Sequence, residues 1–144
     1  MAAIPGRRWT ALAGPGSRER GSAVAEFVMV AGLLLLIAVG VFQLGLTLHV
    51  RNTLVACAAE GARAGARADA AEGQATARTV ALITDGLSSA YAAQVTSHRV
   101  TTADGVRVVE VTVTAPTPII GLLGPSGTMT VTGRAFDERQ VATP

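Results

Sequence analysis

The chain has 144 residues, which at ~100–200 residues per domain leaves room for one small domain with one appendage and excludes most multidomain enzymes. Hydrophobic residues make up 49% and charged residues only 15%, so part of the chain is expected in lipid or in a buried core. The net charge of +2 belongs to the N-terminus, because residues 1–21 hold four of the twelve arginines and one acid, and the remainder carries −1. With 3% aromatic residues, the sequence predicts no nucleic-acid partner.

Residues 1–20 are predicted to be a disordered basic leader. They combine scattered arginine with glycine and proline, and such a composition buries too little apolar surface to order itself.

The most apolar part of the chain follows, from Phe27 to Leu48. These 22 residues carry no charge, and at ~1.5 Å per residue they cover the ~30 Å hydrocarbon core of a bilayer. A single membrane-spanning helix is therefore predicted. Arginine is concentrated on its N-terminal side, so the positive-inside rule places the N-terminus in the cytoplasm and everything after residue 50 outside. We expect a single-pass protein of the cell membrane with an extracytoplasmic head.

The helix is expected to continue out of the membrane, so that residues 22–69 form a transmembrane helix with an extracytoplasmic extension. Asn52 to Ala71 is rich in alanine with arginine and glutamate, and contains no proline. Small residues recur there at helical spacing, which either lets another helix approach closely or reflects the abundance of alanine. The residues of this predicted packing face are Ala58, Gly61, Ala62 and Gly65.

Residues 70–137 are predicted to form a small α+β head. A short amphipathic helix is expected from about Ala70 to Ser88. The hydrophobic pattern then changes to a period of two, which predicts strands, and Asp104-Gly105 is the signal of a hairpin turn. The three predicted antiparallel strands are Tyr91–Thr101, Val106–Thr114 and Thr128–Phe136.

A loop rich in proline and glycine joins the second and third strands, and it carries the apolar pairs Ile119-Ile120 and Leu122-Leu123. These pairs either plug the sheet face or contact a partner. Residues 138–144 are predicted to be a polar tail. The expected fold class is therefore α+β and membrane-anchored, with a long N-terminal transmembrane helix that extends outward, a short second helix and a small three-stranded antiparallel sheet.

No set of residues points to catalysis, to a metal or to a cofactor. Ser88, His98 and Asp104 supply the residue types of a nucleophilic site, but no nucleophile elbow is present and the small head offers no oxyanion scaffold. Cys57 is the single cysteine and ends a lipobox-like LVAC sequence, yet polar residues separate it from the apolar segment. A small residue on a packed helix is the preferred interpretation of Cys57.

A carboxylate stands at the head of the predicted membrane helix. Residues 21–27 read GSAVAEF, after the basic stretch 18–20 and before the apolar segment. Glu26 by itself is explained by the helix dipole, which favours an acid near the N-terminus by ~0.3–1 kcal/mol. The whole combination of basic leader, glycine, four small residues, Glu-Phe and a long apolar helix resembles the type IV prepilin cleavage motif in its short Flp-type form.

That resemblance implies that a membrane prepilin peptidase cuts between Gly21 and Ser22, so residues 1–21 are a cytoplasmic leader that is removed. Glu26 and Phe27 then become the fifth and sixth residues of the mature chain. The carboxylate of Glu26 is implied to compensate the free amino group of Ser22 on a neighbouring subunit and to set the axial register, because either charge is costly at membrane depth when unpaired.

Residues further along the chain resemble one particular family. Residues 50–54, VRNTL, and 58–65, AAEGARAG, are similar to a stretch of the TadE-like proteins of the tight adherence pilus system. The resemblance covers residues 18–66, whereas residues 67–144 match only in character. Where many relatives have a proline after the glutamate, this chain has Ala31-Gly32.

A TadE-like protein is implied to be a minor pilin or pseudopilin that helps to initiate or build the Flp-type pilus for adhesion. Its implied partners are membrane lipid, other pilins or pseudopilins, the prepilin peptidase and the pilus assembly platform, and it is either incorporated in surface pili or retained in the membrane. The alternative is an uncleaved single-span membrane protein whose small extracytoplasmic domain binds a partner. The spacing of Gly21 and Glu26 discriminates between the two.

Overall fold

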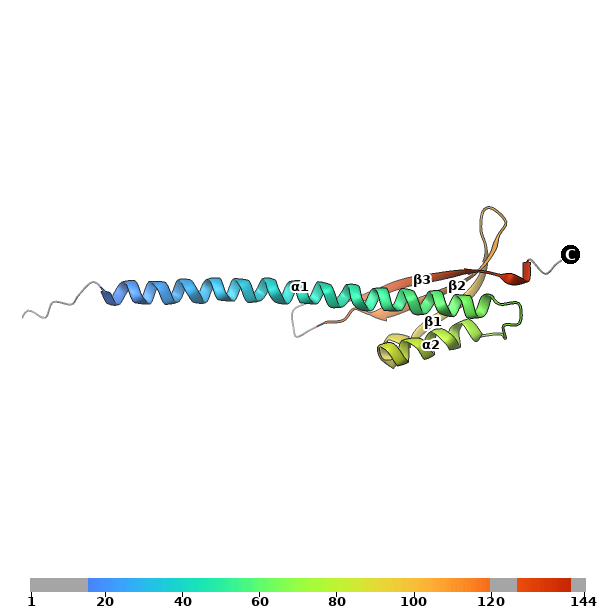
Figure 1. Ribbon diagram of the computed structural model, residues 1–144, viewed down its shortest axis with the longest axis horizontal. Helices are drawn as coiled ribbons and strands as arrows, with labels where there is room; N and C mark the ends of the chain where they lie inside the picture. The colour runs from blue at the N-terminus through green and yellow to red at the C-terminus, as the bar shows by residue number, and fades with distance from the viewer. Residues whose placement is uncertain (1–15, 120–126, 141–144) are drawn as a thin grey trace, which may run out of the picture. The chain divides into compact units, whose positions relative to one another are not determined.

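The computed structural model describes residues 16–119 and 127–140, and it divides into two units between Gly40 and Val41. The predicted leader up to residue 15, the second half of the β2–β3 loop and the end of the tail lie outside the described residues. Figure 1 labels the elements, which are α1 (Gly16–Ala66), α2 (Gln74–Gly86), η1 (Ser89–Ala92), β1 (Gln94–Thr101), β2 (Arg107–Pro116), β3 (Thr128–Phe136) and η2 (Glu138–Gln140). The predicted α+β fold class is confirmed.

Helix α1 is longer at its start, and shorter at its end, than the sequence predicts. It begins at Gly16, within the predicted leader, because Ser17 to Arg20 is free of proline and contains good helix formers. It ends at Ala66 rather than near residue 69 or 71. In the part of the chain that the structure describes, α1 is the one helix long and apolar enough to cross a membrane, and none of its most apolar stretch is buried.

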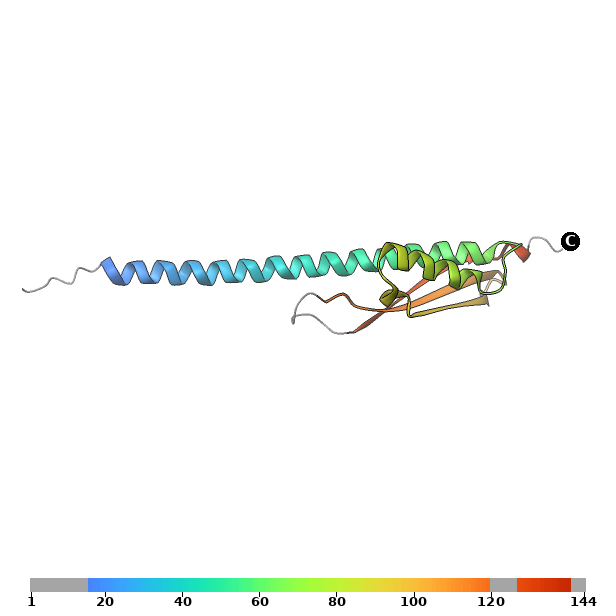
Figure 2. The same ribbon diagram turned by 90° about the horizontal axis from the view of Figure 1, so that it is seen from below.

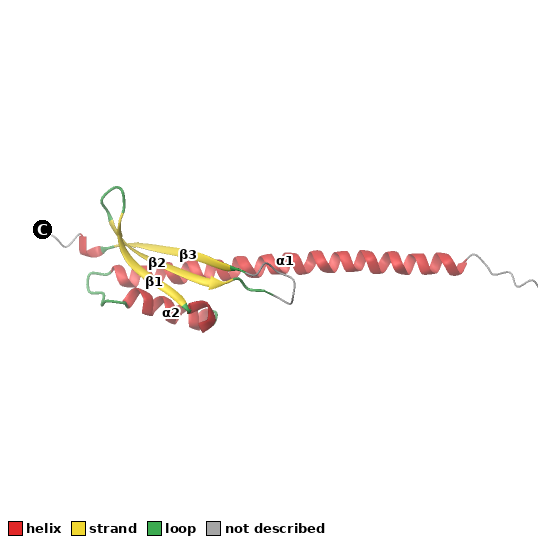
Figure 3. Ribbon diagram, turned by 180° about the vertical axis from the view of Figure 1, so that it is seen from behind, coloured by secondary structure: helices red, strands yellow, loops and turns green. Residues whose placement is uncertain are grey.

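The three strands form one antiparallel sheet in the order β1-β2-β3, which Figure 3 shows in yellow. The Asp104-Gly105 hairpin is confirmed: Gly105 has a φ of 79°, which favours glycine, and its N–H donates to the carbonyl of Thr102 at 2.9 Å. The third strand has the predicted bounds. The first strand begins three residues later than predicted, because the preceding residues form the 3₁₀-helix η1.

The core of the second unit lies between one face of the sheet and the two helices. Figure 2 shows α2 and the C-terminal part of α1 on the same side of the sheet. Alternate residues of β2 point to that side, so Val109, Val111 and Val113 are buried. They pack with Leu54 and Ala58 of α1, and each buried valine or leucine contributes roughly 1.5–3 kcal/mol by removal of apolar surface from water.

Helix α2 begins at Gln74, not at Ala70 as predicted. Gly73 at its start is left-handed, with a φ of 78°, and the side chain of Gln74 accepts a hydrogen bond from the N–H of Ala71. The chain needs residues 67–73 to reverse direction between the helices, so a purely helical pattern cannot continue through them. The predicted boundary between residues 69 and 70 therefore falls inside this turn.

The first residues of the predicted polar tail, Glu138–Gln140, form the short helix η2, which is hydrogen-bonded to the rest of the head. Gln140 accepts from the N–H of Arg107 at 2.8 Å and donates to its carbonyl at 3.1 Å. The guanidinium of Arg139 donates to the carbonyls of Ala68 and Ala70, just past the end of α1, where a cation is favoured. These bonds join η2 to the sheet and to the turn between α1 and α2.

Asp137, the residue before η2, is almost fully buried. One of its carboxylate oxygens lies 3.5 Å from Nε of Arg99, and the other accepts from the N–H of Arg139 at 3.2 Å. A buried carboxylate without such partners is strongly unfavourable, so these contacts explain why the chain tolerates an acid at this position.

Candidate functional site

The residues of the predicted cleavage motif all lie in the first unit, on α1. Gly21, Ser22, Glu26 and Phe27 are exposed, and the side chain of Phe27 is 72% accessible. Within the described ranges, Glu26 has no hydrogen-bond or ion-pair partner. An exposed phenylalanine followed by a long run of exposed aliphatic side chains is stable only against lipid or against other apolar helices.

The peptide bond between Gly21 and Ser22 lies inside α1 and not in front of it. A peptidase that cuts this bond therefore has to open the first turns of the helix, and helix ends are where such local opening costs least. A Cβ added at Gly21 meets no other atom within 4 Å. The fold therefore has room for a Cβ at this position.

The small residues of the predicted packing face lie in the interior of the second unit, where α1 packs against α2 and the sheet. Gly61 and Gly65 face α2, and a Cβ on Gly61 would overlap the side chain of Thr79, whereas one on Gly65 would crowd Ala75. Ala58 and Ala62 are fully buried. This face of α1 is therefore occupied by α2 and by the sheet of the same chain.

The close approach between the sheet and α1 depends on a third glycine, which the sequence analysis did not single out. A Cβ on Gly133 of β3 would overlap backbone atoms of Ala58 and Ala59 in α1. An isolated glycine inside a strand pattern is the signal that points to such an approach.

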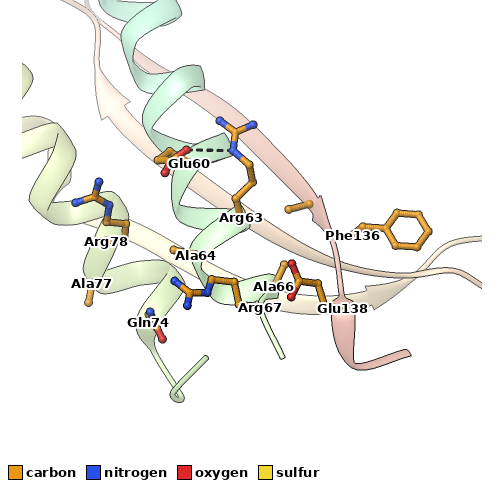
Figure 4. A pocket seen from close by; sticks show the side chains of 11 residues that line it. Glu60, Arg63, Ala64, Ala66, Arg67, Gln74, Ala77, Arg78, Phe136 and Glu138 are labelled. Atoms are coloured by element: carbon orange, nitrogen blue, oxygen red, sulfur yellow. Dashed lines mark hydrogen bonds and ion pairs between the residues drawn. The ribbon is translucent and has the colours of Figure 1, made fainter. Parts of the chain in front are cut away.

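An open groove of ≈ 820 Å³ runs along the head between α1, α2 and the end of β3. Figure 4 shows three arginines around it, Arg63, Arg67 and Arg78, with Arg63 paired to Glu60 at 3.0 Å. Its lining residues include no serine, cysteine or histidine. The groove therefore has the character of a charged surface, lined by arginines and by the carboxylates of Glu60 and Glu138.

Cys57 lies on the buried face of α1, beyond the end of the apolar segment at Leu48, among residues of the hydrophobic core. Burial raises the pKa of the Cys57 thiol by disfavouring the charged thiolate, and a backbone hydrogen bond opposes this only in part. A buried, protonated thiol is a poor nucleophile. These observations agree with the preferred interpretation of Cys57 as a core residue.

Cys57 is expected to react slowly with a thiol reagent in the folded, detergent-solubilised chain. Because its raised pKa lowers the thiolate fraction near neutral pH and burial blocks access, we expect a rate at least ~10-fold below that of the chain unfolded in guanidinium chloride, with the inflection of rate against pH displaced upward. The measurement is the rate of reaction with a chromogenic disulfide over a pH series. Equal rates in the folded and unfolded chain would contradict the burial of this thiol.

One polar residue inside the apolar segment has a defined partner. Nε2 of Gln43 donates to the carbonyl of Pro118, which lies in the β2–β3 connection. Gln43 is a polar residue in an otherwise apolar run of the sequence, but this pattern gives no indication of its partner, 75 residues away.

Comparison with known proteins gives a match to part of the chain. Residues 21–63 match the family model described as TadE-like protein. The match begins at the predicted cleavage residue and runs through the apolar segment into the part of α1 that packs in the head. It confirms the predicted resemblance to the TadE-like proteins over residues 21–63. A search of curated proteins and a search of solved structures each gave no match.

Proposed function

The chain is TadE-like over residues 21–63, and on that basis we propose that it is a minor pilin or pseudopilin of the tight adherence, Flp-type pilus. The family associates the chain with the Tad pilus and with the membrane. The proposed role is to insert α1 among the helices of other pilins, to help initiate or build the filament for adhesion, and to carry the head on the outside of the cell. The N-terminus is then cytoplasmic.

The observation that carries this proposal is the match to residues 21–63, which starts at Gly21. The exposure of α1 supports it, because none of the most apolar stretch is covered by the described part of the chain. Before assembly this surface needs lipid, and during assembly it needs other helices. Because lipid tails are as apolar as leucine, the exchange is driven by close packing and by polar contacts between helices and not by hydrophobicity.

Glu26 supplies the polar contact in this proposal. After cleavage, the amino group of Ser22 carries a positive charge at the edge of an apolar helix bundle. A carboxylate from a neighbouring subunit compensates that charge and fixes the axial offset between subunits, since an unpaired charge is costly at this depth. No catalytic role is proposed for the chain.

Replacing Gly21 with Leu is expected to leave the full-length precursor uncleaved. An added Cβ meets nothing within 4 Å at this position of α1. Recovery of the variant from the membrane in the same amount as the parent chain then shows that the failure reports recognition by the peptidase and not misfolding. The measurement is the intact mass of the protein recovered from its native membrane, compared between the parent chain and the variant.

Gly32→Leu is the matched control, because Gly32 is a second glycine of α1 whose added Cβ meets nothing within 4 Å. This control is expected to be cleaved like the parent chain. Normal cleavage of the Gly21 variant would exclude the proposed site, and an uncleaved parent chain would favour a permanently anchored membrane protein.

A further inference from the structure

The head covers one face of α1 before the apolar segment has ended. Gln43, Leu46 and Thr47 are half-buried and Val50 is buried, which is the spacing of one helix face. Leu46 packs against the hydrophobic core. The segment predicted to cross the membrane runs to Leu48, so the head and the apolar segment overlap from Gln43 onward.

The base of the β2–β3 connection lies at the same level of α1. The side-chain amide of Gln43 donates to the carbonyl of Pro118 at 2.5 Å, and Thr117 and Gly127, at the two ends of the connection, are joined by a backbone hydrogen bond of 2.9 Å. Gln43 precedes Leu48 by five residues, or ~7.5 Å of helix. If the apolar segment is in hydrocarbon up to Leu48, this end of the head is there as well.

Large apolar side chains are exposed at this level. Phe42 is 65% exposed, Leu44 60%, Leu48 49% and Ile119 42%. Three of them belong to α1, and Ile119 follows Pro118, whose carbonyl accepts the hydrogen bond from Gln43. We call these four residues the membrane-proximal rim.

Charge is distributed unevenly along the head. Residues 41–50, 111–119 and 127–133 contain no aspartate, glutamate, lysine or arginine. The ion pairs Arg67–Asp69 and Arg99–Asp137 lie toward the opposite end, where α1 ends and the β1–β2 hairpin turns. A membrane repels an uncompensated charge from its core and accepts an uncharged apolar surface, so this asymmetry matches a head that faces lipid at one end.

We propose that the membrane-proximal rim contacts the bilayer, so that the head is held against the outer leaflet at a second point beside α1. The occupant of the surface is lipid, because three of the four rim residues belong to the apolar segment of α1, and Ile119 directly follows Pro118, whose carbonyl is bonded to Gln43 of that segment. The bond from Gln43 to Pro118 fits this setting, since it satisfies an amide donor and a carbonyl acceptor that would each be costly to leave unpaired in hydrocarbon.

The test measures lipid contact at residue 119 in the full-length chain, reconstituted in vesicles of zwitterionic phospholipid. Ile119→Cys in a Cys57→Ala background is labelled with a small fluorophore, and quenching by lipids with a nitroxide near the headgroup is recorded. Asp104→Cys in the same background is the matched control, because the β1–β2 hairpin lies at the other end of β2. Quenching at residue 119 is expected to exceed that at residue 104 by at least threefold.

Equal quenching at the two positions would overturn the proposal. A label at residue 119 that is shielded from both the lipid nitroxide and aqueous iodide would also overturn it, because the rim would then contact protein. Ile119→Trp in a Trp9→Phe chain, quenched by brominated lipids, repeats the test with Cys57 intact. None of these readouts depends on cleavage or on pilus assembly, so the result is independent of the proposed function.

Discussion

Replacing Glu26 with Ala is expected to leave cleavage intact and to reduce incorporation into pili, or into complexes with other pilins, by ~10-fold or more. A tenfold effect corresponds to ~1.4 kcal/mol, which is modest beside the penalty for an amino-terminal charge left unpaired among apolar helices. The measurement is the amount of mature protein in the membrane and in the sheared pilus fraction.

Two further variants separate charge from other effects of that substitution. Glu26→Gln keeps the size of the side chain and removes its charge, so it is expected to behave like Glu26→Ala. Glu19→Ala removes another acid of the same region that cleavage is expected to discard with the leader, so it is expected to have no effect on assembly. Normal assembly of both Glu26 variants would show that the carboxylate does not set the subunit contact.

Replacing Gly133 with Ala is expected to destabilise the head by about 2–3 kcal/mol. The added methyl overlaps backbone atoms of Ala58 and Ala59, and backbone in a helix cannot move aside as a flexible side chain does. The measurement is thermal or denaturant unfolding of the detergent-solubilised chain, followed by the circular dichroism of the sheet and helices.

Gly127→Ala is the control for this substitution, because a Cβ at Gly127 meets nothing within 4 Å. It is expected to change stability by less than ~0.5 kcal/mol. An unchanged midpoint for Gly133→Ala would mean that β3 does not approach α1 as closely as the structure shows.

The strands were predictable because the local sequence of a strand reflects which of its two faces is buried. Val109, Val111 and Val113 alternate with polar residues, and this local pattern reflects a sheet with one buried face. The hairpin was predictable for a similar reason, since Gly105 supplies the positive φ that the turn requires. The long helix was predictable from the uncharged run from Phe27 to Leu48 and from the alanine-rich, proline-free residues that follow it.

The corrections concern contacts between residues far apart in the sequence. From composition, Glu138 to Gln140 were predicted to belong to a polar tail, yet these residues form hydrogen bonds with Arg107 and with Ala68, in the turn that follows α1. The hydrogen bond between Gln43 and Pro118 could not be predicted either. A periodic pattern indicates which face of a helix is buried, but it does not indicate which residues cover that face. The small-residue face of α1 predicted the close approach of another helix, and the pattern did not show that α2 of the same chain lies against Gly61 and Gly65.

The candidate site is of a different kind, because its function depends on other molecules. Gly21 and Glu26 are exposed on a single helix, and their proposed roles require a peptidase and neighbouring pilins. The motif in the sequence and the match to residues 21–63 therefore support these roles more directly than any contact within the chain does.

The measurement that tests the proposed function most directly is the N-terminal sequence and intact mass of the protein recovered from its native membrane. A pilin processed by prepilin peptidase begins at Ser22, with Glu26 as its fifth residue. A chain that begins at Met1 or Ala2 would contradict the proposal and favour an uncleaved, anchored protein, and one that begins at a lipidated Cys57 would exclude both.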